Sequence, residues 1–349
     1  MSTTSSPSVQ QPSGSGESLL QSLSRRRFLV VTGKGGVGKS AVAASLATLF
    51  ARGGADSLRG RRRKVLIVEI DPRENVHQLL AAPPSGGDVV RIDDRLFVQN
   101  LKPRAALDQL VRRHLAMGLL QRRVLSSETY QQLSEGAPGL KEVAVLDYAE
   151  HRTRERGEDG LGPFDLVILD APATGHGVSL LAAPLLLSEV IQDGPVGRRA
   201  RELASFISRP EALGIVAVTL AEELPAQEVL ELFETIRQRL GRRADALVIN
   251  GLYPRLPEAW EEDPEAQVAA GDAAALAWIR RRRINQREVA RLEASWNGPQ
   301  ALLPLLPLAR GPELIKELQQ GLAEAFGECC EATAAEAMDS EATEVGEER

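Results

Sequence analysis

The sequence predicts an α/β fold in which helices cover both faces of a doubly wound, mostly parallel sheet, with a helical subdomain. Short runs rich in Val, Ile and Leu alternate along the chain with segments of helical period. A glycine-rich loop joins the first run to the first helical segment. Hydrophobic residues make up 43% of the 349 residues and aromatic residues 4%, so Leu, Val, Ala and Ile must fill a sizeable core.

The predicted strands are apolar runs of the kind that parallel sheets bury on both faces. Helical segments separate most of these runs, which indicates right-handed crossover connections. The strands are predicted at residues 28–32, 65–70, 96–100, 164–170, 215–219, 246–250 and 301–304. The main helices are predicted at residues 41–50, 104–124, 140–154, 225–240, 273–294 and 312–326.

Composition divides the chain into three parts. Residues 1–24 are rich in Ser, Pro and Gln and lack an apolar signal core, which predicts a disordered N-terminal tail. Residues 328–349 form an acidic tail, also predicted to be disordered, so the folded domain should span residues 25–327. Its helical regions are expected at about 104–155 and 255–296. The amphipathic segment 104–124 has two interpretations, a groove for a hydrophobic client helix or core packed on the sheet.

Composition also restricts the function. The net charge of −6 and the acidic C-terminal end give no sign of a nucleic-acid partner. Cys329 and Cys330 are the only cysteines, so neither a disulfide framework nor a spaced metal site is predicted, and a reducing compartment is expected. The longest nearly continuous apolar run, 178–187, is about half as long as a bilayer-spanning helix. We therefore expect a soluble, cytoplasmic protein.

The glycine-rich loop carries the strongest functional signal. It matches G-x-x-x-x-G-K-[ST] between a strand and a helix, the context that marks a phosphate-binding loop. Backbone N–H groups and the helix N-terminus would bind nucleotide phosphates, Lys39 would hold the β- and γ-phosphates, and Ser40 would ligate Mg²⁺. The alternative is a glycine-rich turn that opens an ordinary helix. The residues assigned to this loop are Gly33, Lys34, Gly35, Gly36, Val37, Gly38, Lys39, Ser40 and Ala41.

Two acidic residues follow predicted strands, Asp71 and Asp170. In open α/β sheets ligands bind at the carboxyl ends of the strands, so both carboxylates should lie near the phosphates. One carboxylate can support Mg²⁺ through its water shell, and the other can orient a water toward the γ-phosphate. An acid in this position can also be a helix cap.

Lys34 occupies a position that the ordinary loop pattern leaves free, and the loop then resembles the deviant phosphate loop of dimeric ATPases. That class includes MinD, ParA, the nitrogenase iron protein and the ArsA group. The resemblance implies that Lys34 reaches across a homodimer to the partner's nucleotide, much as an arginine finger does. The alternative is a solvated loop lysine.

Within that class the other motifs resemble the ArsA family, which contains arsenite-efflux pump ATPases and ATPases that target tail-anchored membrane proteins. The resemblance runs from about residue 28 to residue 326 and implies that Asp71 activates water, that Asn250 reads adenine and that the loop ending at Pro307 packs on the base. The matching segments are Asp71-Pro-Arg-Glu-Asn-Val for the first switch, Ala137-Pro-Gly-Leu-Lys-Glu, Asp170-Ala-Pro-Ala-Thr-Gly-His for the second switch, Val248-Ile-Asn250 and Pro304-Leu-Leu-Pro307.

Several positions depart from the family pattern. Arg73 and Glu74 replace a small residue and a His in the first switch, and Pro172 lies one position early in the second. The cysteines that bind metalloid in arsenite pumps are missing from the helical region, and no zinc-binding Cys-x-x-Cys pair occurs near residues 268–275. The sequence therefore does not identify the cargo.

The expected function is ATP hydrolysis by a nucleotide-switched homodimer that uses Mg²⁺. Asp71, Lys34 and Lys39 are the predicted catalytic residues, and Ser40 and Asp170 are predicted to hold the metal, Asp170 through its water shell. The output would be a movement of the helical regions that acts on a membrane-protein client or a membrane transport partner. Two alternatives are a ParA- or MinD-like positioning ATPase and a nucleotide-binding scaffold with little turnover.

Overall fold

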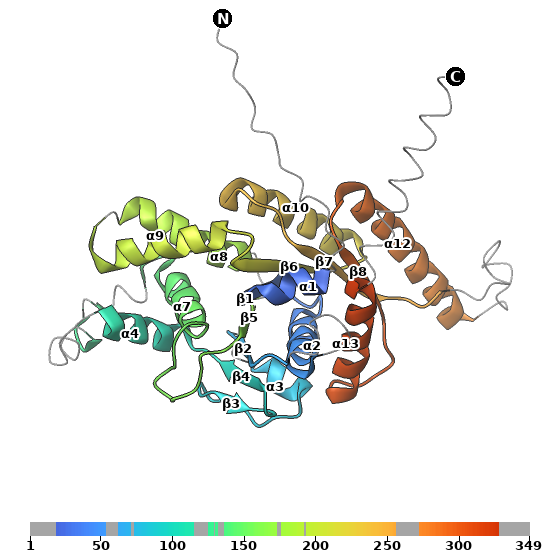
Figure 1. Cartoon of the computed structure of the whole chain (residues 1–349). Helices are drawn as coiled ribbons and strands as arrows, with labels where there is room; N and C mark the ends of the chain where they lie inside the picture. Colours follow the sequence, from blue (N-terminus) through green and yellow to red (C-terminus); the bar gives the residue numbers. More distant parts are fainter. Residues whose placement is uncertain are drawn as a thin grey trace, which may run out of the picture.

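In the computed structural model, a twisted sheet lies between two layers of helices (Figure 1). The structure describes residues 19–53, 62–70, 73–114, 125–128, 130–131, 136–172, 176–191, 193–255 and 272–327. Within these residues the sheet has eight strands in the order β3-β4-β2-β5-β1-β6-β7-β8. The strands are β1 (Phe28–Gly33), β2 (Val65–Glu69), β3 (Val90–Arg91), β4 (Leu96–Asn100), β5 (Leu166–Asp170), β6 (Leu213–Leu220), β7 (Ala246–Leu252) and β8 (Gln300–Pro304).

All neighbouring strands are parallel except β3 and β4, which are antiparallel. The chain moves outward from β1 to one edge of the sheet and then to the other, so the carboxyl ends of β1, β2 and β5 meet at the switch point of a doubly wound fold. The predicted fold class is confirmed. The seven predicted strands are present, whereas β3 was not predicted because two residues are too short to show a period.

Helices cover both faces of the sheet (Figure 1). Helices α4, α7, α8 and α9 lie on one face, and α1, α2 and α13 on the other. The helices are α1 (Leu19–Arg25), α2 (Lys39–Arg52), α3 (Asn75–Leu79), α4 (Pro103–His114), α7 (Leu140–His151), α8 (His176–Val190), α9 (Gly194–Ser208), α10 (Glu223–Leu240), α12 (Ala273–Ser295) and α13 (Pro312–Gly327).

Successive side chains of the central strands enter different cores. In β1, Phe28 and Val30 belong to the core under α7 and α8, whereas Leu29 and Val31 belong to the core under α2 and α13. Each such side chain contributes about 1.5–3 kcal/mol relative to full exposure. Burial on both faces explains why these strands are continuous apolar runs without polar alternation.

The N-terminal prediction needs a correction. We expected residues 1–24 to be disordered, but α1 begins at Leu19, and Leu19, Leu20 and Leu23 are buried. Their spacing places them on one face of a helix turn, where they pack in the core that α2 and α13 share with the sheet. The rest of the predicted tail, residues 1–18, lies outside the described residues.

The helical regions are described in part. In the segment 104–124, Leu107 and Leu110 are buried in the core, as the packing interpretation requires, and residues 115–124 lie outside the described residues. Helix α12 matches the prediction for 273–294. Helix α9 was not predicted, although Ala200, Leu203 and Ile207 have helical spacing and are buried. None of the described helices has the length and apolar composition that a bilayer crossing requires.

Candidate nucleotide-binding site

The glycine loop runs from the end of β1 to the start of α2, as its sequence predicts. A Cβ atom on Gly33 (φ 149°) would lie 2.1 Å from the carbonyl oxygen of Val218 on β6. A Cβ on Gly38 (φ 94°) would lie 2.3 Å from Nδ2 of Asn250. Both positions therefore require glycine, for its positive φ and for its missing side chain. The two glycines therefore fix the shape of the turn, and the N-terminus of α2 is directed at its concave side.

Lys39 is the first residue of α2, and its side chain is buried under the loop. Its Nζ donates a hydrogen bond of 2.9 Å to the backbone oxygen of Lys34, so the amine lies along the inner side of the turn. If a phosphate bound here, the Lys39 amine would exchange its neutral carbonyl acceptor for an ionised phosphate oxygen. Hydrogen bonds to ionised acceptors are stronger.

Ser40 and Asp170, the two residues predicted to hold the metal, lie in contact. Ser40 Oγ donates a hydrogen bond of 2.6 Å to Oδ2 of Asp170, which lies at the carboxyl end of β5. The neighbouring strand β2 ends at Glu69, which is in register with Asp170. A hydroxyl that donates to a carboxylate keeps its oxygen lone pairs for a cation, and hard oxygen ligands of this kind suit Mg²⁺. The pair thus fits the predicted metal position.

A cavity of about 660 Å³ opens in front of the loop. This volume is typical of small-molecule sites. The lining combines the glycine loop and residues of the first switch with a group of leucines that follow β8, among which Arg310 also lies. The lining residues are Gly35, Gly36, Gly38, Lys39, Ser40, Ala41, Arg73, Asn75, Leu79, Asn250, Gly251, Pro304, Leu305, Leu306, Leu308, Arg310, Leu314 and Leu318.

This lining suits a nucleotide, whose phosphates would bind to the loop and whose base would pack among the leucines. Asn250 is oriented by a hydrogen bond of 3.0 Å from its Nδ2 to the carbonyl oxygen of Val37. Its Oδ1 can then accept from an exocyclic amine, which adenine has and guanine lacks at that edge. Pro307 is not among the lining residues, whereas its neighbours Leu306 and Leu308 are. The predicted base contact of Pro307 remains a prediction.

The first switch is described from Arg73 onward, so the predicted catalytic Asp71 lies outside the described residues. Glu69, just before it, accepts from the backbone N–H groups of Asn75 (2.7 Å) and Val76 (3.2 Å) and so caps α3. Glu74 adopts φ 48° and accepts a hydrogen bond of 2.8 Å from the backbone N–H of Ser85. These contacts fix α3 beside the phosphate end of the cavity.

The second switch begins where predicted. Ala171, the residue after Asp170, donates its N–H to the carbonyl oxygen of Val31 at 3.0 Å, so the turn leaves the sheet beside β1. Residues 173–175 lie outside the described residues, as do the side chain of His176, both cysteines and residues 268–271 of the segment where the family's zinc pair would lie.

Two features of the site were not predicted. The Lys34 ammonium makes an ion pair with Glu228 of α10, which is 194 residues away in the chain. Arg73 lines the phosphate end of the cavity, although the sequence marked it as a departure from the family pattern. For Arg73, its departure from the family pattern was a signal in the sequence. No local pattern marks Glu228, because an acid on an amphipathic helix usually lies on a solvated face.

The chain is similar in sequence to several known ATPases. ATPase BagA of Mycobacterium tuberculosis is 29% identical over 221 residues, which cover 62% of this chain and 62% of that protein. An arsenical pump-driving ATPase of Escherichia coli is 28% identical over 267 residues, 70% of this chain and 42% of that one. ATPase GET3C of Arabidopsis thaliana is 26% identical over 181 residues, 47% of this chain and 42% of that one. The chain thus matches less than two thirds of the length of each relative.

A family model described as anion-transporting ATPase matches residues 26–206, just over half of the chain. The match includes the glycine loop, both switches and β5, the elements that form the phosphate end of the cavity. The predicted family is confirmed: the chain belongs to the ArsA family of anion-transporting ATPases.

Proposed function

We propose that this chain binds Mg²⁺-ATP in the large cavity and hydrolyses it as a homodimer. The observation that carries the proposal is the joint placement of the glycine loop, buried Lys39 and the Ser40–Asp170 hydrogen bond at a cavity that a group of leucines also lines. Each part has a role in phosphoryl transfer, and catalysis of that reaction depends mainly on positioning and charge stabilisation.

The phosphates would bind to the N–H groups of the loop and to the positive end of α2. Lys39 would turn from the Lys34 carbonyl to the β- and γ-phosphate oxygens. Ser40 would ligate Mg²⁺ directly, and Asp170 would hold the Ser40 hydroxyl and the water shell of the metal. The bound Mg²⁺ would neutralise the charge that develops on the phosphates. Asp71 would orient the attacking water, and Lys34 of a second copy would complete the site.

Helices α4 and α7 of the first helical region are suited to move with α9 as a rigid unit. Arg199 of α9 contacts Asp147 and Glu150 of α7, each at 2.5 Å, and Arg113 of α4 pairs with Asp147. Burial lowers the pKa of the Arg199 guanidinium, but the charges of Asp147 and Glu150 outweigh burial and raise that pKa overall. This buried ionic network ties α4, α7 and α9 together. We propose that opening and closing of the dimer moves the helical regions near 104–155 and 255–296 against a membrane-protein client or a membrane transport partner.

The test is steady-state phosphate release from ATP by the purified chain and by Asp71→Asn. We expect the variant to lose about 10²-fold or more in kcat, because the attacking water loses its acceptor, while ATP affinity is retained. A fluorescent ATP analogue measures the affinity. Equal turnover in the two proteins would exclude Asp71 from catalysis, and negligible turnover in both would favour the nucleotide-binding scaffold.

A further inference from the structure

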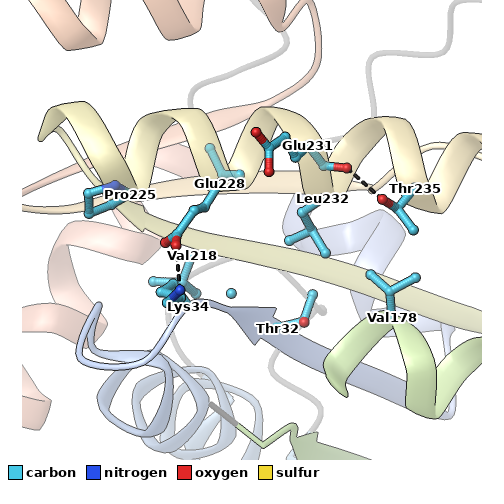
Figure 2. Close-up of a pocket in the computed structure, with 11 residues that line it drawn as sticks. Thr32, Lys34, Val178, Val218, Pro225, Glu228, Glu231, Leu232 and Thr235 are labelled. Atoms are coloured by element: carbon cyan, nitrogen blue, oxygen red, sulfur yellow. Dashed lines mark hydrogen bonds and ion pairs between the residues drawn. The ribbon is translucent and has the colours of Figure 1, made fainter. Parts of the chain in front are cut away.

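A second, smaller cavity of about 280 Å³ lies beside the glycine loop, between β1, β6, α8 and α10 (Figure 2). Lys34 and Glu228 form a bridge at its edge, with Glu228 reaching down from α10. Apolar side chains such as Val178 and Leu232 form much of the wall. Lys34 lines this cavity, whereas the residues that line the nucleotide cavity include its neighbours Gly35 and Gly36 but not Lys34 itself.

Loss of the contact with Lys34 would leave the partly buried Glu228 carboxylate without a counter-charge. Its side chain is 21% exposed, and its Oε2 is buried without a hydrogen-bond partner among the described residues. A carboxylate that is partly desolvated needs a cation, because an uncompensated charge in such a position is costly. Lys34 is 47% exposed and lies at the surface, from which its flexible stem can swing to another anion. In a protomer without a partner, the ion pair therefore favours the position of Lys34 against Glu228.

We propose that Glu228 is a positioning residue that holds Lys34 within its own protomer until an ATP-bound partner takes the lysine. This inference rests on the proposed function, in which Lys34 acts across the dimer. The partner's nucleotide is a stronger anion than one carboxylate, so it can displace Glu228 where water does not. The pair then opposes dimer formation in the absence of ATP and prevents idle assembly.

Helix α10 also connects this ion pair to a helical region. Arg281 of α12 contacts Glu222 at 3.1 Å, and Arg287 of α12 contacts Glu223 at 2.5 Å, one turn before Glu228. Both pairs are exposed and individually weak, but they attach the first turn of α10 to α12. A shift of α12 would thus move α10, the helix that carries Glu228. In the same way, release of Lys34 would change the position of α12.

The chain offers a matched control on the same helix. Glu231 lies three residues after Glu228 and lines the same cavity, but its carboxylate accepts a hydrogen bond of 2.8 Å from Gln227 and not from Lys34. Glu228→Gln and Glu231→Gln each remove one negative charge and keep the shape of the side chain. A general effect of charge would appear in both variants, and release of Lys34 in Glu228→Gln alone.

The first readout is the rate at which acetic anhydride labels Lys34 in the nucleotide-free protein, followed by mass spectrometry. An amine held against the Glu228 carboxylate is less accessible to the reagent than a released amine. We expect Glu228→Gln to raise the labelling rate about two- to fivefold, the range of a partly exposed ion pair, and Glu231→Gln to leave it unchanged. Equal labelling in all three proteins would overturn the proposal.

The second readout is ATP-dependent dimerisation, measured by sedimentation velocity. Each protomer breaks one pair, so the two factors multiply, and Glu228→Gln should raise the dimerisation constant about 4- to 25-fold. Faster labelling without tighter dimerisation would also overturn the proposal, because the pair would then not oppose assembly. If the wild-type chain neither dimerises with ATP nor hydrolyses it, the proposed function fails. If it does both and Glu228→Gln behaves identically, the inference alone fails.

Discussion

Replacement of Lys39 by alanine is expected to reduce kcat/KM for ATP by about 10²- to 10³-fold, the usual cost of removing one preorganised donor from a developing charge. Lys39 is buried under the glycine loop, with its amine 2.9 Å from the Lys34 carbonyl, whereas the other lysine of the loop, Lys34, pairs with Glu228 and lines a different cavity. Steady-state phosphate release measures the effect.

Arg52→Ala is the control for this prediction, because Arg52 is a cationic residue at the opposite, exposed end of the same helix. We expect its activity to match the wild type. A Lys39→Ala protein that folds normally and retains more than about a tenth of the wild-type kcat/KM would contradict the assigned role, since that loss is below the range for one donor.

The second large effect is expected for Asp170→Asn. The amide keeps the shape of the carboxylate but removes its charge, so Ser40 loses the acceptor that holds its hydroxyl at 2.6 Å and the metal loses an anionic neighbour. We expect the Mg²⁺ concentration for half-maximal activity to rise about 10- to 100-fold, as for other residues that orient a metal ligand. A Mg²⁺ titration of ATPase activity measures this shift.

Asp165→Asn is the matched control at the other end of β5. Asp165 immediately precedes the strand and accepts the backbone N–H of Lys64 at 2.8 Å, far along the strand from the loop. Its Mg²⁺ dependence should equal that of the wild type. If Asp170→Asn shows the same Mg²⁺ requirement as Asp165→Asn, Asp170 does not support the metal.

The sheet and the phosphate end of the site were predictable because their signals are local. The strand around Val30 is apolar on both faces, and the loop pattern places Lys39 and Ser40 within one turn. The contact of Ser40 with Asp170 spans 130 residues, yet the rule that parallel strands end at one edge already placed Asp170 near the loop.

Other parts depended on contacts that no short window contains. The segment of α1 was predicted to be part of a disordered tail. Leu19 and Leu23 are ordered by burial in the core shared with α13, a contact that the local sequence does not contain. Glu228 resembles its exposed neighbours on α10 in sequence, and only the fold brings it to Lys34. A local pattern gives the face of a helix, but not the residue that it meets.

The ATP-dependent homodimer is tested most directly by the specific ATPase activity as a function of protein concentration, with sedimentation velocity on the same samples. If Lys34 completes the site of a second copy, specific activity falls in proportion to protein concentration below the dimer dissociation constant and reaches a plateau above it. A constant specific activity through the range in which the protein sediments as a monomer would show that one copy suffices, and would contradict the dimeric mechanism.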